Sequence, residues 1–290
     1  MILGTAGLLP AEVLAVARAG ARVRLSPAAL RAMRTARAVV EGLSSAPTPT
    51  YGVSTGFGAL ATHHIAPELR TQLQRSLIRS HAAGIGPAVE RDVVRAMMLL
   101  RLRTLASGRT GARPLLAEAI AGLLNAGITP VVPEHGSLGC SGDLAPLAHC
   151  ALVLLGEGRA VGPDGAEGPV PVLLAAHGLE PVVLTEKEGL ALINGTDAML
   201  AMLLLAIADL EQLLRAADVC AAMTVEALLG TDRPFAADLQ DLRPHPGQAA
   251  SAANLTRLLR GSPVVASHRT DDVRVQDAYS LRCSPQVAGA

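Results

Sequence analysis

Apolar residues recur at helical spacing along much of the chain. After Ser26-Pro27, the apolar residues from Leu30 to Leu43 lie roughly one helical turn or two turns apart. Serine is a favoured N-cap and proline a favoured first helical residue, so this pair predicts the start of a helix. The same pattern predicts further helices over residues 67–80, 87–107 and 114–126, the last of them ended by Gly127.

The middle of the chain is predicted to alternate extended and loop segments with helices. Residues 128–133 are expected to be extended, and residues 134–142 form a loop of small side chains. Asp143 can serve as the N-cap of a helix over residues 144–155. Residues 156–170 are rich in glycine and contain turn residues, which predicts an exposed hairpin or loop.

The pattern then predicts a short helix followed by a long one. Thr185-Glu186-Lys187-Glu188 has the form of a capping box, and the helix after it is expected to stop near Asn194-Gly195. Residues 196–229 are predicted to form a single helix with few charges, so a bundle core or a subunit interface must cover most of its surface. We therefore expect one domain over residues 1–195 and the start of a central helical bundle over residues 196–290.

The composition favours helix over strand. Half of the residues are hydrophobic, and they are mostly Ala, Leu and Val, with only two Tyr, two Phe and no Trp. Leu, Ala, Met and Arg all have high helix propensity. The fold class is therefore predicted to be mainly α, with an N-terminal loop-and-helix domain in front of the bundle.

The charge balance excludes several classes of partner. The 25 basic Lys and Arg residues match the 25 acidic residues, whereas nucleic-acid and membrane-surface binding both favour a basic surplus. The most apolar stretch, residues 198–208, is shorter than the ~20 residues that span a bilayer. No signal peptide is visible, and the four cysteines have neither disulfide nor metal-ligand spacing. We expect a cytoplasmic protein without a metal, a membrane partner or a nucleic-acid partner.

The loop Gly136–Asp143 carries the candidate chemistry. Natural side chains include no good carbon electrophile, but a backbone nitrogen can make one by attacking the carbonyl two residues earlier. The nitrogen of Gly142 would close such a ring on the carbonyl of Cys140, and loss of water from the ring and from Ser141 would leave a methylidene. From spacing alone, a flexible Gly/Ser loop that ends in an N-cap is the more common explanation.

This loop, continued through His149, is similar to the signature of the aromatic amino acid ammonia-lyases, and within them to histidine ammonia-lyases. Most members have Ala where this chain has Cys140, a residue that contributes only its carbonyl to the ring. The resemblance implies a methylidene-imidazolone group formed from Cys140-Ser141-Gly142, with no metal or dissociable cofactor. Four further segments match in the same order, namely 51–58, 80–84, 194–197 and 276–283.

The resemblance also implies roles for single residues. Tyr51 would remove a proton from the β-carbon of the substrate, although a tyrosine in a glycine loop can also be a packing plug. His81 would hold the substrate imidazole, which is our main reason for expecting histidine as the substrate. Arg282 would bind the substrate carboxylate through its forked guanidinium. The remaining candidates are Asn194 at the ring or substrate, and Gln276 and Tyr279 at the polar rim.

The implied function is the conversion of L-histidine to urocanate and ammonia, in homotetramers whose active sites are shared between subunits. Family members are longer than this chain, so an inactive fragment is one alternative. A phenylalanine or tyrosine ammonia-lyase, or an aminomutase, is another. Gly52–Gly56 also fits the G-x-S-x-G elbow of serine hydrolases, but Pro47 and Pro49 precede it where that elbow needs a strand.

Overall fold

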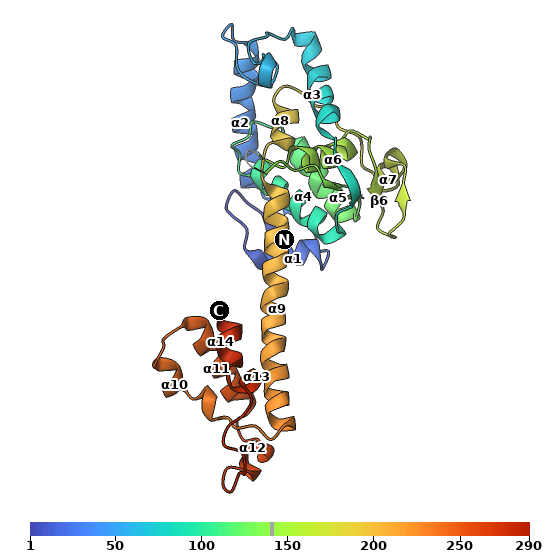
Figure 1. The fold of residues 1–290 in the computed structure, drawn as a ribbon. Helices are drawn as coiled ribbons and strands as arrows, with labels where there is room; N and C mark the ends of the chain where they lie inside the picture. The colour runs from blue at the N-terminus through green and yellow to red at the C-terminus, as the bar shows by residue number, and fades with distance from the viewer. Residues whose placement is uncertain (140–141) are drawn as a thin grey trace. The chain divides into compact units, whose positions relative to one another are not determined.

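The computed structural model describes residues 1–139 and 142–290 and is mainly helical, as predicted (Figure 1). The chain folds into two compact units, Met1–Leu205 and Ala206–Ala290. Helix α9, Asp197–Ala227, is shared by the two units. The boundary expected at 195/196 marks the start of this helix, whereas packing divides the chain within it.

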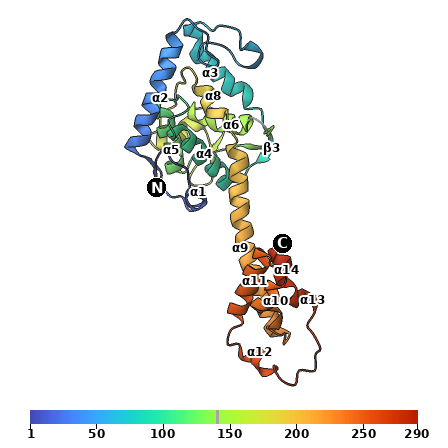
Figure 2. The same cartoon turned by 90° about the vertical axis from the view of Figure 1, so that its left-hand side faces the viewer.

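The first unit is built around helix α4. Twelve residues of α4 (Arg91–Ala106) are buried, among them Met97, Leu99 and Leu102. Helices α1 and α5 pack directly against α4, and α8 packs against α3 and α6 (Figures 1 and 2). The other helices of this unit are α1 (Pro10–Ala17), α2 (Pro27–Ser45), α3 (Pro67–His81), α5 (Pro114–Ala126), α6 (Leu144–Leu154), α7 (Val170–Ala176) and α8 (Glu188–Ile193), with a 3₁₀ turn η1 (Gly58–Leu60).

Short strands tie the loops of the first unit together. Strand β3 (Ile85–Ala88) runs antiparallel to β5 (Pro133–His135), with Ile85 opposite His135. This pairing corrects the predicted start of a helix at residue 87, because Pro87 and Ala88 belong to the strand and α4 begins only at Arg91. The other strands are β1 (Ile2–Leu3) parallel to β2 (Arg24–Leu25), and an antiparallel sheet in the order β4 (Thr129–Pro130), β6 (Ala160–Val161) and β7 (Glu167–Gly168).

Several predicted helix ends agree with the structure. The Ser26 hydroxyl accepts a hydrogen bond from the Ala29 N–H at the start of α2, and Gly127 ends α5 with a φ of 72°. The capping box at Thr185 is only half formed. The Glu188 carboxylate accepts the Thr185 N–H at 2.9 Å, but the Thr185 hydroxyl is buried without a hydrogen-bond partner in the described part of the chain. The Glu188 carboxylate also forms an ion pair with Arg113 at 2.7 Å. The helix begins at Glu188 itself.

The second unit has a small core of its own. Phe235 and Leu255 are almost fully buried in it, together with Val225 of α9 and Leu281. Helix α11 (Pro246–Leu258) packs against α14 (Ser284–Gly289) (Figure 2). The remaining elements are η2 (Arg233–Phe235), α10 (Ala237–Asp241), α12 (Pro263–Ser267) and α13 (Tyr279–Arg282).

One helical stretch stands out by its composition. Over the described residues, Glu188–Ala227 is long and apolar enough to cross a membrane by length and composition alone, with a mean hydropathy of 1.9 in its most apolar window. This stretch extends beyond residues 198–208 in both directions, so the length expected from the sequence was too short. Of that window, 39% is buried within the molecule, and core helices of soluble proteins have similar compositions.

Candidate functional site

Hydrogen bonds connect the described residues of the predicted reactive loop. The Gly142 N–H donates to the Gly139 carbonyl at 2.9 Å, and the Ser137 hydroxyl donates to the Asp143 carboxylate at 2.6 Å. Gly142 has a φ of 150°, which an L-residue rarely adopts. Cys140 and Ser141, the other two residues of the predicted tripeptide, lie outside the described residues.

Gly142 lies directly against Gly195. A Cβ on Gly142 would come within 2.6 Å of the Gly195 carbonyl oxygen and 2.9 Å of its nitrogen. The next residue adds a hydrogen bond, because the Asp143 N–H donates to the same Gly195 oxygen at 2.5 Å. The reactive loop and the turn Asn194–Asp197 therefore touch backbone to backbone, and Gly142 cannot be replaced without moving one of them.

The Asp143 side chain caps a different helix from the one predicted. Its carboxylate is fully buried and accepts hydrogen bonds from the N–H groups of Ala198 at 2.8 Å and Met199 at 3.1 Å, in the first turn of α9. It makes no capping bond to α6, which begins at the next residue. With a ψ of 56°, the backbone of Asp143 is outside the extended region that N-cap residues normally occupy.

Two buried carboxylates lie together at the start of α9. Burial raises the pKa of Asp197, and the nearby Asp143 raises it further, while an ion pair with the buried Arg101 opposes both effects. Burial and the Asp197 charge also raise the pKa of the Cys150 thiol, so Cys150 is no thiolate nucleophile. Asn194, just before this cluster, ends α8, and its side chain is exposed.

The segment around His81 is held beside the reactive loop. His81 is the last residue of α3 and not part of a loop after it, as the predicted end at residue 80 implied. The Gly84 N–H donates to Nε2 of His149 at 3.1 Å, and a Cβ on Gly136 would lie 3.1 Å from the Gly84 Cα. Strand pairing between Ile85 and His135 extends this contact.

The two histidines use their ring nitrogens differently. Nδ1 of His81 lies 2.9 Å from the Leu77 carbonyl and donates to it, which leaves Nε2 as the ring nitrogen available to a ligand. His149 accepts a hydrogen bond at Nε2, so its proton is on Nδ1 when it is neutral. Partial burial lowers the pKa of His149 and keeps it neutral at neutral pH.

The Tyr51 loop packs on the helix that ends at Asn194. The Lys187 N–H donates to the Gly52 carbonyl at 3.1 Å, and a Cβ on Gly52 would contact the Leu190 side chain at 3.3 Å. The Tyr51 hydroxyl accepts the Gly58 N–H at 3.2 Å. The ring meets Phe57 edge to face but remains 49% exposed, so Tyr51 is not a buried packing plug.

Three predicted site residues belong to the second unit. The Arg282 guanidinium lies 4.5 Å from the centre of the Tyr279 ring, a cation–π contact. Arg282 and Gln276 line the same pocket, and the buried Nε of Arg282 has no hydrogen-bond partner in the described residues. Within the first unit, the reactive loop contacts the segments of His81 and Asn194, and the Tyr51 loop contacts α8. Gln276, Tyr279 and Arg282 belong to the second unit.

Sequence reasoning missed three contributors to this site. His149 accepts the Gly84 N–H, the Asp143 side chain caps α9 and not the helix directly after it, and Arg101 donates to the carbonyl of Asn194. A signal for Arg101 did exist, since it is a charged residue within the apolar run from Met97 to Leu102 of a predicted helix. Over the described residues, no group of His, Cys, Asp and Glu could hold a metal ion.

The chain is similar to known proteins of one family. Residues 8–290 match the model of the aromatic amino acid lyase family. Histidine ammonia-lyases from Streptomyces coelicolor and Gloeobacter violaceus are 64% identical over 290 residues and 50% identical over 291 residues. Both matches cover 100% of this chain, but only 57% and 56% of the relatives. The chain thus spans little more than half the length of these curated relatives.

Solved structures of the same kind are also similar. Tyrosine aminomutase from Streptomyces globisporus is 36% identical with a TM-score of 0.89, over 100% of this chain and 58% of its own. Histidine ammonia-lyase from Trypanosoma cruzi is 36% identical with a TM-score of 0.87, over 99% of this chain and 53% of its own. Ergothionase from Treponema denticola is 27% identical with a TM-score of 0.92, over 100% of this chain and 57% of its own.

Proposed function

The chain belongs to the aromatic amino acid lyase family, and on this premise we propose that it acts in the elimination of ammonia from L-histidine to give urocanate. The observation that carries the proposal is the contact, within the first unit, of the reactive loop with the segments of His81 and Asn194, while the Tyr51 loop packs on α8, the helix before Asn194. The histidine ammonia-lyases at 62–64% identity support histidine over phenylalanine or tyrosine as the substrate.

The residues around Gly142 suit the formation of a methylidene-imidazolone group. The unusual φ of Gly142 and its contact with the Gly195 backbone make a cradle that only glycine fits. Such a group, formed from Cys140-Ser141-Gly142, supplies a carbon electrophile for the substrate amine. The N-terminus of α6, which begins at Leu144, provides partial positive charge beside the loop, and this charge stabilises negative charge that develops there.

The other residues are proposed to bind the substrate and move its proton. His81 directs its Nε2 at the imidazole, and Arg282, whose Nε has no hydrogen-bond partner among the described residues, binds the carboxylate through its guanidinium. Tyr51, whose side chain is half-exposed, accepts the proton from the β-carbon at its phenolate oxygen and so becomes the neutral phenol. Asn194 hydrogen-bonds near the reacting amine, and Gln276 and Tyr279 complete the polar rim. We propose that these residues meet in a self-associated, cytoplasmic homotetramer.

Urocanate formation tests this function directly. The protein is incubated with L-histidine, L-phenylalanine or L-tyrosine, and the unsaturated acid product is followed by its ultraviolet absorbance. We expect product from histidine and little from the other two. Product from phenylalanine or tyrosine alone would indicate a sister lyase, and β-amino acid products would indicate an aminomutase.

Intact mass tests the electrophile independently of activity. The wild-type protein should be lighter than its sequence by two water molecules. Ser141→Ala should keep both waters and lose activity by several orders of magnitude, whereas Cys140→Ala should retain the ring and the activity, because residue 140 contributes only its carbonyl. Full activity of Ser141→Ala would overturn the assignment, and an inactive wild type that keeps both waters would favour an inactive fragment.

A further inference from the structure

A buried arginine in the core of the first unit contacts the turn that carries Asn194. The guanidinium of Arg101, on α4, donates from Nη1 to the carbonyls of Ala191 and Asn194, both at 3.1 Å. Nη2 is bonded to the Asp197 carboxylate in a buried ion pair. One side chain, only 4% exposed, thus joins the end of α8 to the beginning of α9.

The turn leaves space for this guanidinium because residue 195 is a glycine. A Cβ on Gly195 would overlap Nη2 of Arg101 and the Asp197 carboxylate, so only glycine fits between Asn194 and the ion pair. The other side of Gly195 is in contact with Gly142 and accepts the Asp143 N–H. A displacement of Arg101 would therefore be transmitted through Gly195 to the backbone of the reactive loop.

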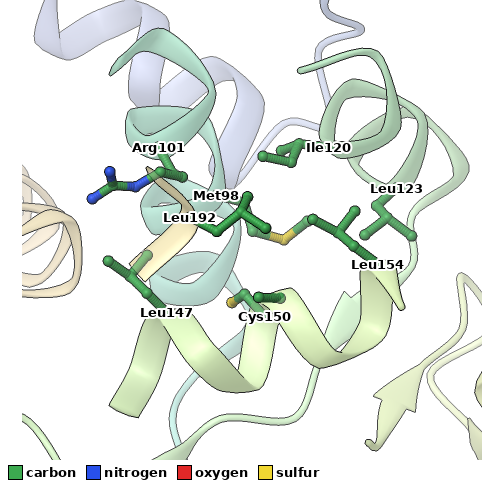
Figure 3. A pocket seen from close by; sticks show the side chains of 9 residues that line it. Met98, Arg101, Ile120, Leu123, Leu147, Cys150, Leu154 and Leu192 are labelled. Atoms are coloured by element: carbon green, nitrogen blue, oxygen red, sulfur yellow. The ribbon is translucent and has the colours of Figure 1, made fainter. Parts of the chain in front are cut away.

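The side chain lies at the edge of a small apolar pocket. Figure 3 shows the guanidinium of Arg101 turned away from Met98, Leu147 and Cys150, which line that pocket. Filling the core does not explain why the residue is an arginine, because an apolar side chain would pack there without the cost of burying a charge. The contacts that require a planar, forked donor are made to Ala191 at the end of α8 and to Asn194 and Asp197 in the turn that follows.

We propose that Arg101 is a positioning residue for the lyase reaction. It holds the turn Asn194–Asp197 in one conformation, and thereby sets the direction of the Asn194 side chain and the backbone against which Gly142 cyclises. This inference rests on the proposed function for its chemical consequence. The structural part, a turn held by Arg101, can be measured whether or not that function is correct.

The same helix offers a matched control. Arg95 is also on α4 and 4% exposed, and it also donates to backbone carbonyls. Its acceptors are Val16, Ala17 and Leu124, at 2.9–3.3 Å, and none of them belongs to the 194–197 turn. Arg95→Lys therefore removes an equally buried guanidinium without touching the turn.

The test compares Arg101→Lys with Arg95→Lys by hydrogen exchange and intact mass on the full chain. A lysine keeps the charge but cannot reach all three acceptors. In Arg101→Lys, amides of residues 194–199 should exchange roughly tenfold faster or more, and part of the protein should keep the two waters. In Arg95→Lys, these amides and the mass should match the wild type, and faster exchange should appear near α1.

The outcomes separate the two proposals. If Arg101→Lys leaves the exchange of residues 194–199 unchanged, the positioning role is wrong. If the wild type itself keeps both waters, the proposed function fails, and the exchange comparison alone decides the role of Arg101. Should Arg101→Lys not fold, Gly195→Ala replaces it, because its methyl group must displace the guanidinium. The proposal is also wrong if folded Gly195→Ala forms the ring completely and if its amides of residues 194–199 exchange hydrogen at the wild-type rate.

Discussion

At the scale of single residues, two glycines decide how the reactive loop can be built. A Cβ on Gly142 would meet the Gly195 backbone, and a Cβ on Gly195 would meet the side chains of Arg101 and Asp197. The φ of 150° at Gly142 adds a second requirement, because this conformation is essentially restricted to glycine. These constraints act on the nitrogen that the proposed cyclisation needs, so the loop geometry and the chemistry depend on the same residue.

Gly142→Ala should prevent ring formation and lower the free energy of unfolding by about 1–3 kcal/mol through backbone strain and the contact with Gly195. Intact mass reports the ring, and urea unfolding reports the stability. Gly165→Ala is the control, because Gly165 also has a positive φ, 85°, but a Cβ there would meet no atom within 4 Å. If Gly142→Ala forms the ring at the wild-type level, the inference that only glycine fits at position 142 is wrong.

His149 is predicted to make the stability of the first unit dependent on pH. Burial lowers its pKa in the fold below the ordinary value of 6.5, and its Nε2 can accept the Gly84 N–H only while neutral. The unfolded chain therefore takes up the proton first. The contribution of His149 is fully present above pH 6.5 and is lost as the pH falls towards the folded pKa.

Urea unfolding of the wild type and of His149→Gln between pH 5 and pH 8 checks this. Glutamine keeps an acceptor near the Nε2 position but does not titrate, so the variant should lose stability less steeply below pH 6.5. Identical slopes for the two proteins would show that His149 does not titrate on unfolding.

At the scale of elements, the start of α9 is held by residues from other parts of the chain. The Asp143 carboxylate, which precedes α6, accepts two N–H groups of the first turn of α9. A carboxylate at this end is also favoured by the helix dipole. The ends of two helices and the reactive loop are thereby joined at one buried group.

Asp143→Ala should therefore destabilise the protein by about 1–2 kcal/mol, because it removes a charged cap and leaves buried N–H groups unpaired. The loss should appear as faster hydrogen exchange in the first turn of α9, with the first turn of α6 changed less. Ser137→Ala removes only the hydroxyl that bonds the other carboxylate oxygen, so it should cost less. An effect confined to α6 would restore the original assignment of the cap.

At the scale of the whole molecule, α9 exposes an apolar stripe. Leu203, Ile207, Leu210 and Leu214 follow one another at spacings of four and three residues, and all four are at least 39% exposed. This spacing is the one that helices bury against one another in bundles. The stripe supports the proposed self-association, which would cover these exposed residues of the segment 196–229.

Leu210→Glu should weaken this association, because a charge would then have to be buried in an apolar contact. Sizing chromatography with light scattering should show a shift towards smaller species by at least tenfold in the apparent dissociation constant. Val172→Glu changes an equally exposed apolar residue on α7 and should leave the association unchanged. An unaltered size distribution for Leu210→Glu would exclude the stripe from the interface.

The sequence by itself determined most of what depends on neighbours along the chain. The long helix α9, the cap at Ser26 and the C-cap at Gly127 all follow from local hydrogen bonding and backbone preference. The family signature likewise lies in short segments, so the candidate residues could be named from the sequence.

Only the tertiary structure decided which of these segments touch. Arg101 and Asp197 are 96 residues apart, and Asp143 caps a helix that begins 54 positions further along, after α6, α7 and α8. Pro87 and Ala88 belong to strand β3 where the start of a helix was predicted, because Ala88 pairs with Pro133 across the fold. Such contacts depend on packing between distant parts of the chain, and local propensity and spacing contain no information about which distant partner will be reached.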